Sequence, residues 1–312
     1  MIRPSIYAKS ALEDSNIKSK VDIGCDGIEI QLLAELVDGK LGCYHYAKDV
    51  YDMSLVEKYN ITAVHCPLLS HYGLSDVNIE SLCDSNDFML LDQVCYIANE
   101  AGKYHNRKTI VVVHSETFRG SMMLLGDTWK RVLNCVGCLL CKYQYIEFAI
   151  ENITPIREVE KGNFHLSNNF YNDNIEIVEE LRNQLNTDRV GTVLDTCHAE
   201  ISNKVYKALR NIMPDVIPVM NLSMDKYFEM NKDLVKLFHF SHTVGSGYGE
   251  GRHGQPFTED SKDVLMNYLR LYGKYDIKAP ISLEVAEIDY LKSDGYASSY
   301  KTILECFEGL GI

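Results

Sequence analysis

The sequence lacks several features by which whole classes of protein are recognised. No apolar run approaches the roughly 20 residues that a membrane-spanning helix needs, and the first residues, MIRPSIYAKS, lack the apolar stretch of a secretory signal. We therefore expect a cytoplasmic protein with no membrane partner. Basic residues are also few: 31 Lys and Arg against 44 Asp and Glu give a net charge of −13. This balance argues against a generally basic nucleic-acid surface, although it leaves room for a local groove.

Linkers and nucleotide-binding loops are missing as well. No stretch rich in Pro, Gly or Ser divides the 312 residues, and no internal repeat is visible. The length lies within the range of single-domain barrels, so the expectation is one domain over residues 1–312. Neither GxGxxG nor GxxxxGK[ST] follows a strand-like run, which removes the fingerprints of nucleotide-binding open sheets.

The ten cysteines show no spacing typical of a small disulfide-bonded scaffold. Reduced thiols are therefore expected, in agreement with a cytoplasmic protein. Cys135, Cys138 and Cys141 have a spacing that resembles an iron–sulfur motif, but no fourth cysteine lies nearby. They fall in an apolar-faced, helix-like segment, residues 129–145. We expect them to be buried small hydrophobic residues on that helix, with a cluster or metal site as the alternative.

What the sequence does contain is an apolar, β-branched run followed by a helix-like stretch, repeated eight times. The expected strands are 2–8, 27–32, 62–68, 109–114, 147–152, 190–196, 235–241 and 279–285. The clearest expected helices are 87–103, 124–142, 174–187, 258–272 and 297–308. Continuously apolar strands are typical of a parallel sheet that is buried on both faces. This alternation predicts an α/β fold, a (β/α)8 TIM barrel, with a doubly wound open sheet as the alternative.

Acids and imidazoles mark the ends of six successive expected strands. In chain order the strand ends carry His65, His114, Glu151, Asp195 with His198, His239 and Glu284, and the loop after the seventh strand carries His253. In a barrel these ends meet at the face where active sites lie. Buried together, such groups are costly without a partner, and a divalent cation accepts both carboxylate and neutral imidazole ligands.

Each residue also has a simpler interpretation when it is taken alone. His65 or His114 alone would be interpreted as a hydrogen-bonded core histidine. Asp195 alone could cap the following turn, and Glu151 alone could pair with an arginine. The joint pattern favours a metal site built from Glu151, Asp195, His239 and Glu284. Cys197 could be a soft ligand, but strand parity predicts that it points away from Asp195 and His198.

In this order the motifs resemble the xylose isomerase-like TIM-barrel superfamily, which includes sugar isomerases and epimerases, inosose dehydratases and endonuclease IV. The segments that carry the resemblance are GCDGIEIQ (24–31), AVHCP (63–67), VVVH (111–114), AIENITP (149–155), LDTCHA (194–199), FHFSH (238–242), GRHGQP (251–256) and SLEV (282–285). LDTCHA and the IEN of AIENITP are the most specific. The resemblance covers nearly the whole chain and implies the same barrel.

The epimerases of this superfamily imply one divalent metal held at the positions of Glu151, Asp195, His239 and Glu284. His198 and Arg252 match the residues that touch substrate there. The implied function is isomerisation or epimerisation of a sugar or sugar phosphate. Glu151 and Glu284 would move a proton next to a metal-bound carbonyl. A carboxylate-rich single site suits Mn, Mg or Co, and a His-rich one suits Zn.

Endonuclease IV implies an alternative, a zinc-dependent phosphodiester hydrolase acting on abasic DNA, with nucleic acid as the partner. Its three zinc ions would be held by His65, His114, Glu151, Asp195, His198, His239, His253 and Glu284. One acidic ligand of that set falls on Gly251, with Glu250 beside it. The loops 65–74 and 115–120 supply only one basic residue, Arg119, where a DNA-binding loop needs more.

A third class is a non-catalytic barrel that binds a metabolite or a partner. Nothing that the one-metal scheme needs is missing from the sequence, which disfavours this class. The apolar final segment, residues 302–312, is compatible with a subunit interface or with closure of the barrel, and closure is expected.

Overall fold

The structure is a computed structural model of the chain. It describes residues 2–37, 44–67, 85–115, 126–160, 163–166, 173–212, 223–244, 252–287 and 292–312. Within these residues no helix is both long and apolar enough to cross a membrane.

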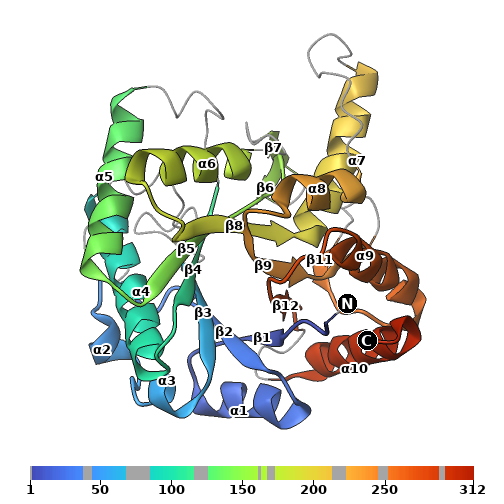
Figure 1. Ribbon diagram of the computed structural model, residues 1–312, viewed down its shortest axis with the longest axis horizontal. Coiled ribbons are helices and arrows are strands. Elements are labelled where there is room, and N and C mark those ends of the chain that lie inside the picture. Colours follow the sequence, from blue (N-terminus) through green and yellow to red (C-terminus); the bar gives the residue numbers. More distant parts are fainter. Residues whose placement is uncertain are drawn as a thin grey trace.

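Eight parallel strands form a closed barrel, which confirms the predicted (β/α)8 fold (Figure 1). The strands are β1 (Ile6–Ser10), β2 (Gly27–Gln31), β3 (Ile61–His65), β4 (Thr109–His114), β5 (Ile146–Glu151), β8 (Val190–Asp195), β9 (Val235–Phe240) and β12 (Ile281–Leu283). Each strand pairs with its neighbour in the chain, and β1 closes the ring by pairing with both β2 and β12. Two antiparallel hairpins add to the barrel, β6 (Ile156–Glu160) with β7 (Asn163–Leu166) and β10 (His242–Val244) with β11 (Arg252–Gln255).

Helices surround the ring of strands, as Figure 1 shows. They are α1 (Asp14–Ile23), α2 (Ala47–Val50), α3 (Leu55–Lys58), α4 (Ser85–Tyr104), α5 (Asp127–Lys142), α6 (Asp173–Leu185), α7 (Thr196–Ile212), α8 (Met224–Asn231), the 3-10 turn η3 (Glu259–Ser261), α9 (Lys262–Lys274) and α10 (Asp294–Leu310). Helix α10 buries Ile303 and Phe307 in the main core. The final segment therefore packs on the barrel, as expected for closure.

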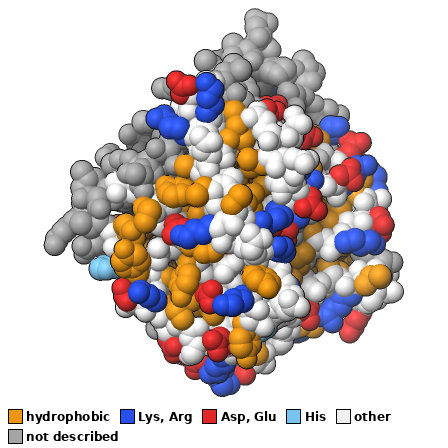
Figure 2. All heavy atoms as spheres, turned by 60° about the vertical axis from the view of Figure 1, so that its left-hand side comes forward, with side chains coloured by type: hydrophobic (Ala, Val, Ile, Leu, Met, Phe, Trp, Pro, Cys, Tyr) orange, Lys and Arg blue, Asp and Glu red, His pale blue; other side chains and the backbone are white. Residues whose placement is uncertain are grey.

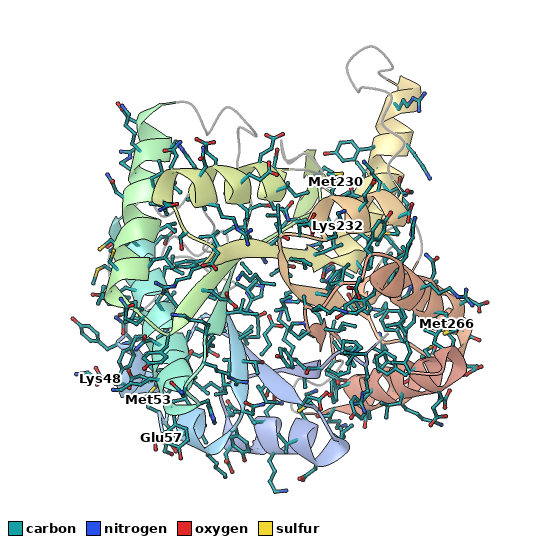
Figure 3. The ribbon with its side chains drawn as sticks, in the orientation of Figure 1. Lys48, Met53, Glu57, Met230, Lys232 and Met266 are labelled. Atoms are coloured by element: carbon teal, nitrogen blue, oxygen red, sulfur yellow. The ribbon has the colours of Figure 1, made fainter. Side chains whose placement is uncertain are left out.

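The inside of the barrel has an apolar layer with a polar layer above it. Ala63, Ile110, Val112, Ala149, Val193 and Leu237 form a small buried cluster inside the ring. Successive side chains of a strand point to opposite faces, so the residue two positions further on also points inward. On five strands that residue is the acid or imidazole predicted from the sequence. Side chains fill the ring, whereas Lys48 and Glu57 lie at its periphery (Figure 3).

The first strand begins four residues later than predicted. Pro4 has no N–H and cannot donate to a ladder, so the paired segment starts after it, at Ile6. Ile2, which we placed in the strand, is 79% exposed. The shift matters because it places Lys9 inside β1, pointing into the barrel.

The three clustered cysteines lie on helix α5, as predicted, but the expectation of burial was wrong for two of them. Cys138 and Cys141 are exposed and Cys135 is partly buried. Each three-residue step turns a helix by about 300°, so the row drifts off the buried face, which Trp129 and Val136 occupy. Among the described residues none of the three belongs to a group that could hold a metal.

Candidate metal centre

Four of the predicted ligands come together at one end of the barrel. Single donor atoms of Glu151, Asp195, His239 and Glu284 all lie within 4.8 Å of one another. Parallel pairing aligns the ends of β5, β8 and β9, with Asp195 opposite His239 in the register. Glu284 directly follows β12, and its backbone N–H donates to Phe240 O at 3.1 Å, which holds it beside β9. The structure thus brings together the four residues proposed from the sequence.

Glu151 lies at the centre of the cluster and faces histidines on both sides. Its Oε1 is 3.1 Å from His239 Nδ1, and its Oε2 is 3.1 Å from His65 Nε2. His114 Nε2 lies 3.6 Å from the same Oε2. His65, His114 and Glu151 form a second group whose donor atoms lie within 4.8 Å of one another. Glu151 is therefore shared between two candidate ligand sets.

The protonation of His65 follows from its backbone contact. Its Nδ1 lies 2.9 Å from Cys66 O, and a carbonyl oxygen only accepts, so Nδ1 carries the proton. Burial, together with the positive charge of Lys9, lowers the pKa of His65, so its neutral form has a lone pair on Nε2. That lone pair faces a Glu151 carboxylate oxygen, and two acceptors at this distance repel unless a cation lies between them.

Asp195 serves the fold and the site with different oxygens. Its Oδ1 accepts the backbone N–H of His198 at 2.5 Å and so caps helix α7, as the simpler interpretation predicted. Its Oδ2 is buried and has no hydrogen-bond partner among the residues that the structure describes. Asn152 fixes the position of Asp195, because its side chain accepts from Asp195 N at 2.8 Å and donates to Asp195 O at 3.1 Å. The Asn of the IEN motif thus ties β5 to β8 beside the site.

His198 stands in the first turn of α7, next to the cluster. Its Nδ1 donates to Asn152 O at 2.8 Å, which leaves Nε2 as an acceptor in the neutral ring. Burial lowers the pKa of His198 despite the neighbouring carboxylates. Its ring stacks on His253, with ring centroids 4.6 Å apart.

A glycine places His253 over the site. Gly254 has φ +69°, a left-handed conformation that favours glycine, and a Cβ there would lie 3.2 Å from Ala286 atoms. Ala286 N also donates to Gly254 O at 2.8 Å, so the β10–β11 hairpin returns against the segment that follows Glu284. The glycine of GRHGQP therefore allows the close approach that brings His253 to the barrel mouth.

Sequence reasoning missed two charged residues that complete the cluster, the buried Glu29 and the partly buried Lys9. Glu29 on β2 accepts from His239 Nε2 at 3.1 Å, and Lys9 on β1 lies 2.7 Å from Glu284 Oε1 and 3.8 Å from Glu29 Oε1. Glu29 is wholly buried in an apolar run, a signal present in GIEIQL. Lys9 had no such signal, because the expected first strand ended at residue 8.

The contact with Glu29 determines which His239 nitrogen is free to bind a metal. A proton on Nε2 is held by Glu29, which leaves Nδ1 facing Glu151 and, at 2.7 Å, Glu284 Oε2. Metal-binding histidines commonly donate their second N–H to a carboxylate in this way, which orients the ring. Without a metal, the same carboxylates favour a protonated His239. Burial lowers the pKa of His239, but the charges of Glu29, Glu151 and Glu284 outweigh burial and raise this pKa well above its usual value.

The carboxylates of the cluster have opposite pKa shifts. Burial raises the pKa of Asp195 to about 7, and the charges of Glu284 and Glu151 add to the effect. Burial also raises the pKa of Glu151 and of Glu284, but nearby cations outweigh it, and both pKa values fall well below the usual range. His239 is the main cation for Glu151, and Lys9 for Glu284. Glu151 and Glu284 are therefore ionised, whereas Asp195 beside them resists ionisation.

The residues fit a divalent cation. Among the described residues, Glu29 Oε2, Asp195 Oδ2 and His253 Nε2 are buried without a hydrogen-bond partner. Each such atom costs about 1–3 kcal/mol when nothing satisfies it. Among the described ion pairs, Lys9 is the only lysine that contacts a carboxylate of this cluster, those of Glu29 and Glu284. The three carboxylates and one imidazole of Glu151, Asp195, His239 and Glu284, whose donor atoms lie within 4.8 Å of one another, form a donor set that Mn, Mg, Co or Zn accepts.

A cavity of about 170 Å³ opens beside the cluster. It is lined by Lys9, Asn16, Lys20, Gln31, Leu33, His253, Gly254, Glu284, Val285, Ala286 and Glu287. The side chain of Glu284 is 19% exposed, whereas Asp195 and His239 are fully buried. Glu284 and His253 therefore connect the buried centre to the space where a small molecule would lie.

Some predicted positions fall outside the described part of the structure. The backbone of Arg252 begins β11, but its side chain is not described. Glu250, Gly251 and Arg119 lie outside the described residues, as do most of the loops 65–74 and 115–120.

Cys197 contradicts the expectation that it points away from the site. Its Sγ lies within 4.8 Å of donor atoms of Asp195 and His253. The reason is that β8 ends at Asp195 and helix α7 begins at Thr196, so the two-residue alternation of a strand no longer applies at Cys197.

Comparison with known proteins supports the fold. No family model and no curated protein matches the sequence. Among solved structures, D-allulose 3-epimerase from Methylomonas sp. in complex with D-allulose is similar with a TM-score of 0.57 at 12% identity, covering 98% of this chain and 97% of that chain. Mannonate dehydratase from Streptococcus suis serotype 2 is similar with a TM-score of 0.56 at 10% identity, covering 99% of this chain and 95% of that chain. SacUVDE is similar with a TM-score of 0.53 at 10% identity, covering 97% of this chain and 99% of that chain.

These similarities extend over nearly the whole of each chain, and similar structures also include one described as a xylose isomerase-like TIM barrel protein and one described as a xylose isomerase domain containing protein. The protein therefore has the xylose isomerase-like TIM-barrel fold, as the sequence motifs indicated. Four of the similar structures are described as sugar epimerases or epimerase-like, and one as a mannonate dehydratase.

The link between Glu29 and His239 leads to a testable prediction. Replacing Glu29 by glutamine removes the carboxylate that holds the proton on His239 Nε2. We expect metal affinity to fall by about 10- to 100-fold, the usual effect of losing such a partner. Isothermal titration with Mn²⁺ measures it. Glu57→Gln, an exposed change at the periphery (Figure 3), is the control. Equal affinity in the two variants would remove Glu29 from the centre.

Proposed function

We propose that the protein is a divalent-metal-dependent isomerase or epimerase of an unphosphorylated sugar. The observation that carries this proposal is the convergence of donor atoms from Glu151, Asp195, His239 and Glu284 within 4.8 Å, beside a cavity of small-molecule size. A divalent cation bound there would polarise the carbonyl of a ketose or aldose and acidify the neighbouring C–H.

Glu151 and Glu284 are the proton-transfer groups in this proposal. Both stay ionised, since nearby cations hold the pKa of each well below its usual range, so each can accept a proton. Glu284 is the more accessible, lining the cavity with its Oε1 held by Lys9 at 2.7 Å. Lys9 orients this carboxylate and offsets negative charge as a proton arrives. One glutamate would remove the proton and the other would return it.

His198 and Arg252 are proposed to hold the substrate. Because His198 Nδ1 donates to Asn152, neutral His198 offers Nε2 as an acceptor, suited to a sugar hydroxyl. Arg252, whose backbone begins β11, is proposed to steady the negative charge that develops on a substrate oxygen, because a guanidinium stays charged at neutral pH.

The charges of the cavity favour a neutral sugar over a sugar phosphate. Both lysines in its described lining are ion-paired, Lys9 with Glu284 and Lys20 with Glu287 at 3.2 Å. A phosphate entering this space would meet two carboxylates and no uncompensated cation among these lining residues. Asn16 and Gln31 add the neutral polar groups that sugar hydroxyls need.

Solvent exchange tests the proposal directly. The purified protein is incubated with Mn²⁺, Mg²⁺, Co²⁺ or Zn²⁺ and a panel of free ketoses and ketose phosphates in D₂O. We expect deuterium to enter next to the carbonyl of a free ketose, with a new sugar appearing in the proton NMR spectrum. No exchange with any sugar, in protein shown to hold metal, would contradict the proposal.

A phosphodiester hydrolase is the second candidate, favoured by one observation. His65 and His114 form a further ligand set with Glu151, which a one-metal isomerase does not need. Figure 2 shows basic and acidic side chains interspersed on the side of the molecule that lies to the left in Figure 1. An incision assay on abasic-site DNA tests this candidate, and cleavage without any ketose exchange would replace the first proposal.

A further inference from the structure

A third group of donor atoms lies beside the proposed centre. A carboxylate oxygen of Asp195, Sγ of Cys197 and a ring nitrogen of His253 are within 4.8 Å of one another. The three come from the end of β8, the first turn of α7 and hairpin strand β11. The chain thus brings a thiol, an imidazole and a carboxylate to one point, although only the first two residues are near each other in sequence.

Two residues of this group have an atom without a partner among the described residues. His253 Nε2 and Asp195 Oδ2 are both buried and make no hydrogen bond there, whereas Asp195 Oδ1 caps α7. Cys197 is fully buried, and its Sγ lies 3.9 Å from His242 O. A buried nitrogen and a buried oxygen with nothing to bind point to an occupant that accepts both as ligands.

From this arrangement we infer a second metal position, held by Cys197, His253 and Asp195. A thiolate, an imidazole and a carboxylate are zinc ligands, and the sulfur selects a soft or borderline divalent cation over Mg²⁺ or Mn²⁺. On binding, the thiol proton leaves for solvent and the contact to His242 O is lost. Asp195 would then lie between two cations, one at each position.

This position goes beyond the proposed isomerase, whose metal uses no sulfur. It also differs from the zinc-rich set implied by the resemblance, in which Cys197 has no part and the missing acid falls on Gly251. The opposing interpretation is that Cys197 only packs, since it begins a buried row on α7 with Ile201 and Val205. The two interpretations predict different spectra.

Cobalt titration of the full-length protein separates them, because cobalt bound to a thiolate absorbs in the near ultraviolet and cobalt bound only to nitrogen and oxygen does not. We expect two equivalents of Co²⁺ to bind, with the thiolate band rising together with one of them. In Cys197→Ser the band and one equivalent are lost, whereas the other equivalent remains. The control is Cys306→Ser, a change at a buried cysteine of α10, which should keep the thiolate band and both equivalents of Co²⁺.

His253→Gln provides a second test that leaves the thiol in place. It should lose the same equivalent and the same band, and circular dichroism checks that each variant is folded. A wild-type protein that binds one equivalent without the band, or a band that persists in Cys197→Ser, overturns the second position. Neither result touches the first metal, which the remaining equivalent and the ketose exchange assay report separately.

Discussion

Glu284→Gln is expected to lower the rate of ketose exchange by about 10²- to 10⁴-fold, the usual contribution of a general acid or base. Glutamine has nearly the same shape but cannot take up a proton at neutral pH. Lys9 would lose the carboxylate that it contacts at 2.7 Å. Exchange is measured at saturating metal, with metal content determined for each variant, so that lost chemistry is distinguished from lost metal.

The control for this variant is Glu57→Gln, which changes the same atoms on exposed helix α3 at the periphery of the barrel (Figure 3). It should exchange ketose as the wild-type protein does. Full activity in Glu284→Gln, with metal bound, would remove Glu284 from the mechanism. Loss of metal without a change in the rate per bound metal would make Glu284 a ligand only.

Metal binding should raise the stability of the protein strongly above neutral pH and much less below it. A ligand at 1,000 times its Kd stabilises a folded protein by about 4 kcal/mol. Here the metal competes with a proton on Asp195, whose pKa burial raises to about 7. Below that pH the apparent affinity should fall by up to about tenfold per unit for this one proton. Thermal unfolding with and without Mn²⁺ from pH 5 to pH 8 measures the effect.

In protein stripped of metal, the Asp195 carboxyl should make the folded state more stable at low pH than at high pH. Because the folded pKa of Asp195 is above its unfolded value of about 3.9, its protonation stabilises the folded state. That contribution is complete below about pH 4 and is lost as the pH rises through about 7. Asp195→Asn should abolish both pH effects while still capping α7, since asparagine is as good a cap as aspartate. A metal-induced shift that is equal at pH 5 and pH 8 would contradict this account.

Much of the site could be predicted because the strands are buried on both faces. Apolar runs located all eight strands to within a few residues, and the first charged residue at each end stood out against them. His65, His114, Glu151, Asp195 and His239 were found in this way. The closed barrel confirms that these strand ends meet.

Lys9 and Glu29 could not be assigned in the same way. Glu29 is visible as an acid within an apolar strand, but its partner His239 lies 210 residues away on the opposite part of the ring. Their contact exists only because β1 pairs with both β2 and β12 and so closes the barrel. Lys9 was hidden by the misplaced first strand, and its contact with Glu284 spans 275 residues.

By itself the sequence determined the barrel and four converging donors, because alternation of strand and helix and the two-residue period of a strand are local properties. The tertiary structure alone decided which donors are shared, which nitrogen of His239 is free and where Cys197 lies. Glu151 belongs to two ligand sets and Asp195 also to two, one of which they share, since strand register and barrel closure set those distances. The turn from β8 into α7 rotates Cys197 towards Asp195, a change of period that strand parity does not foresee.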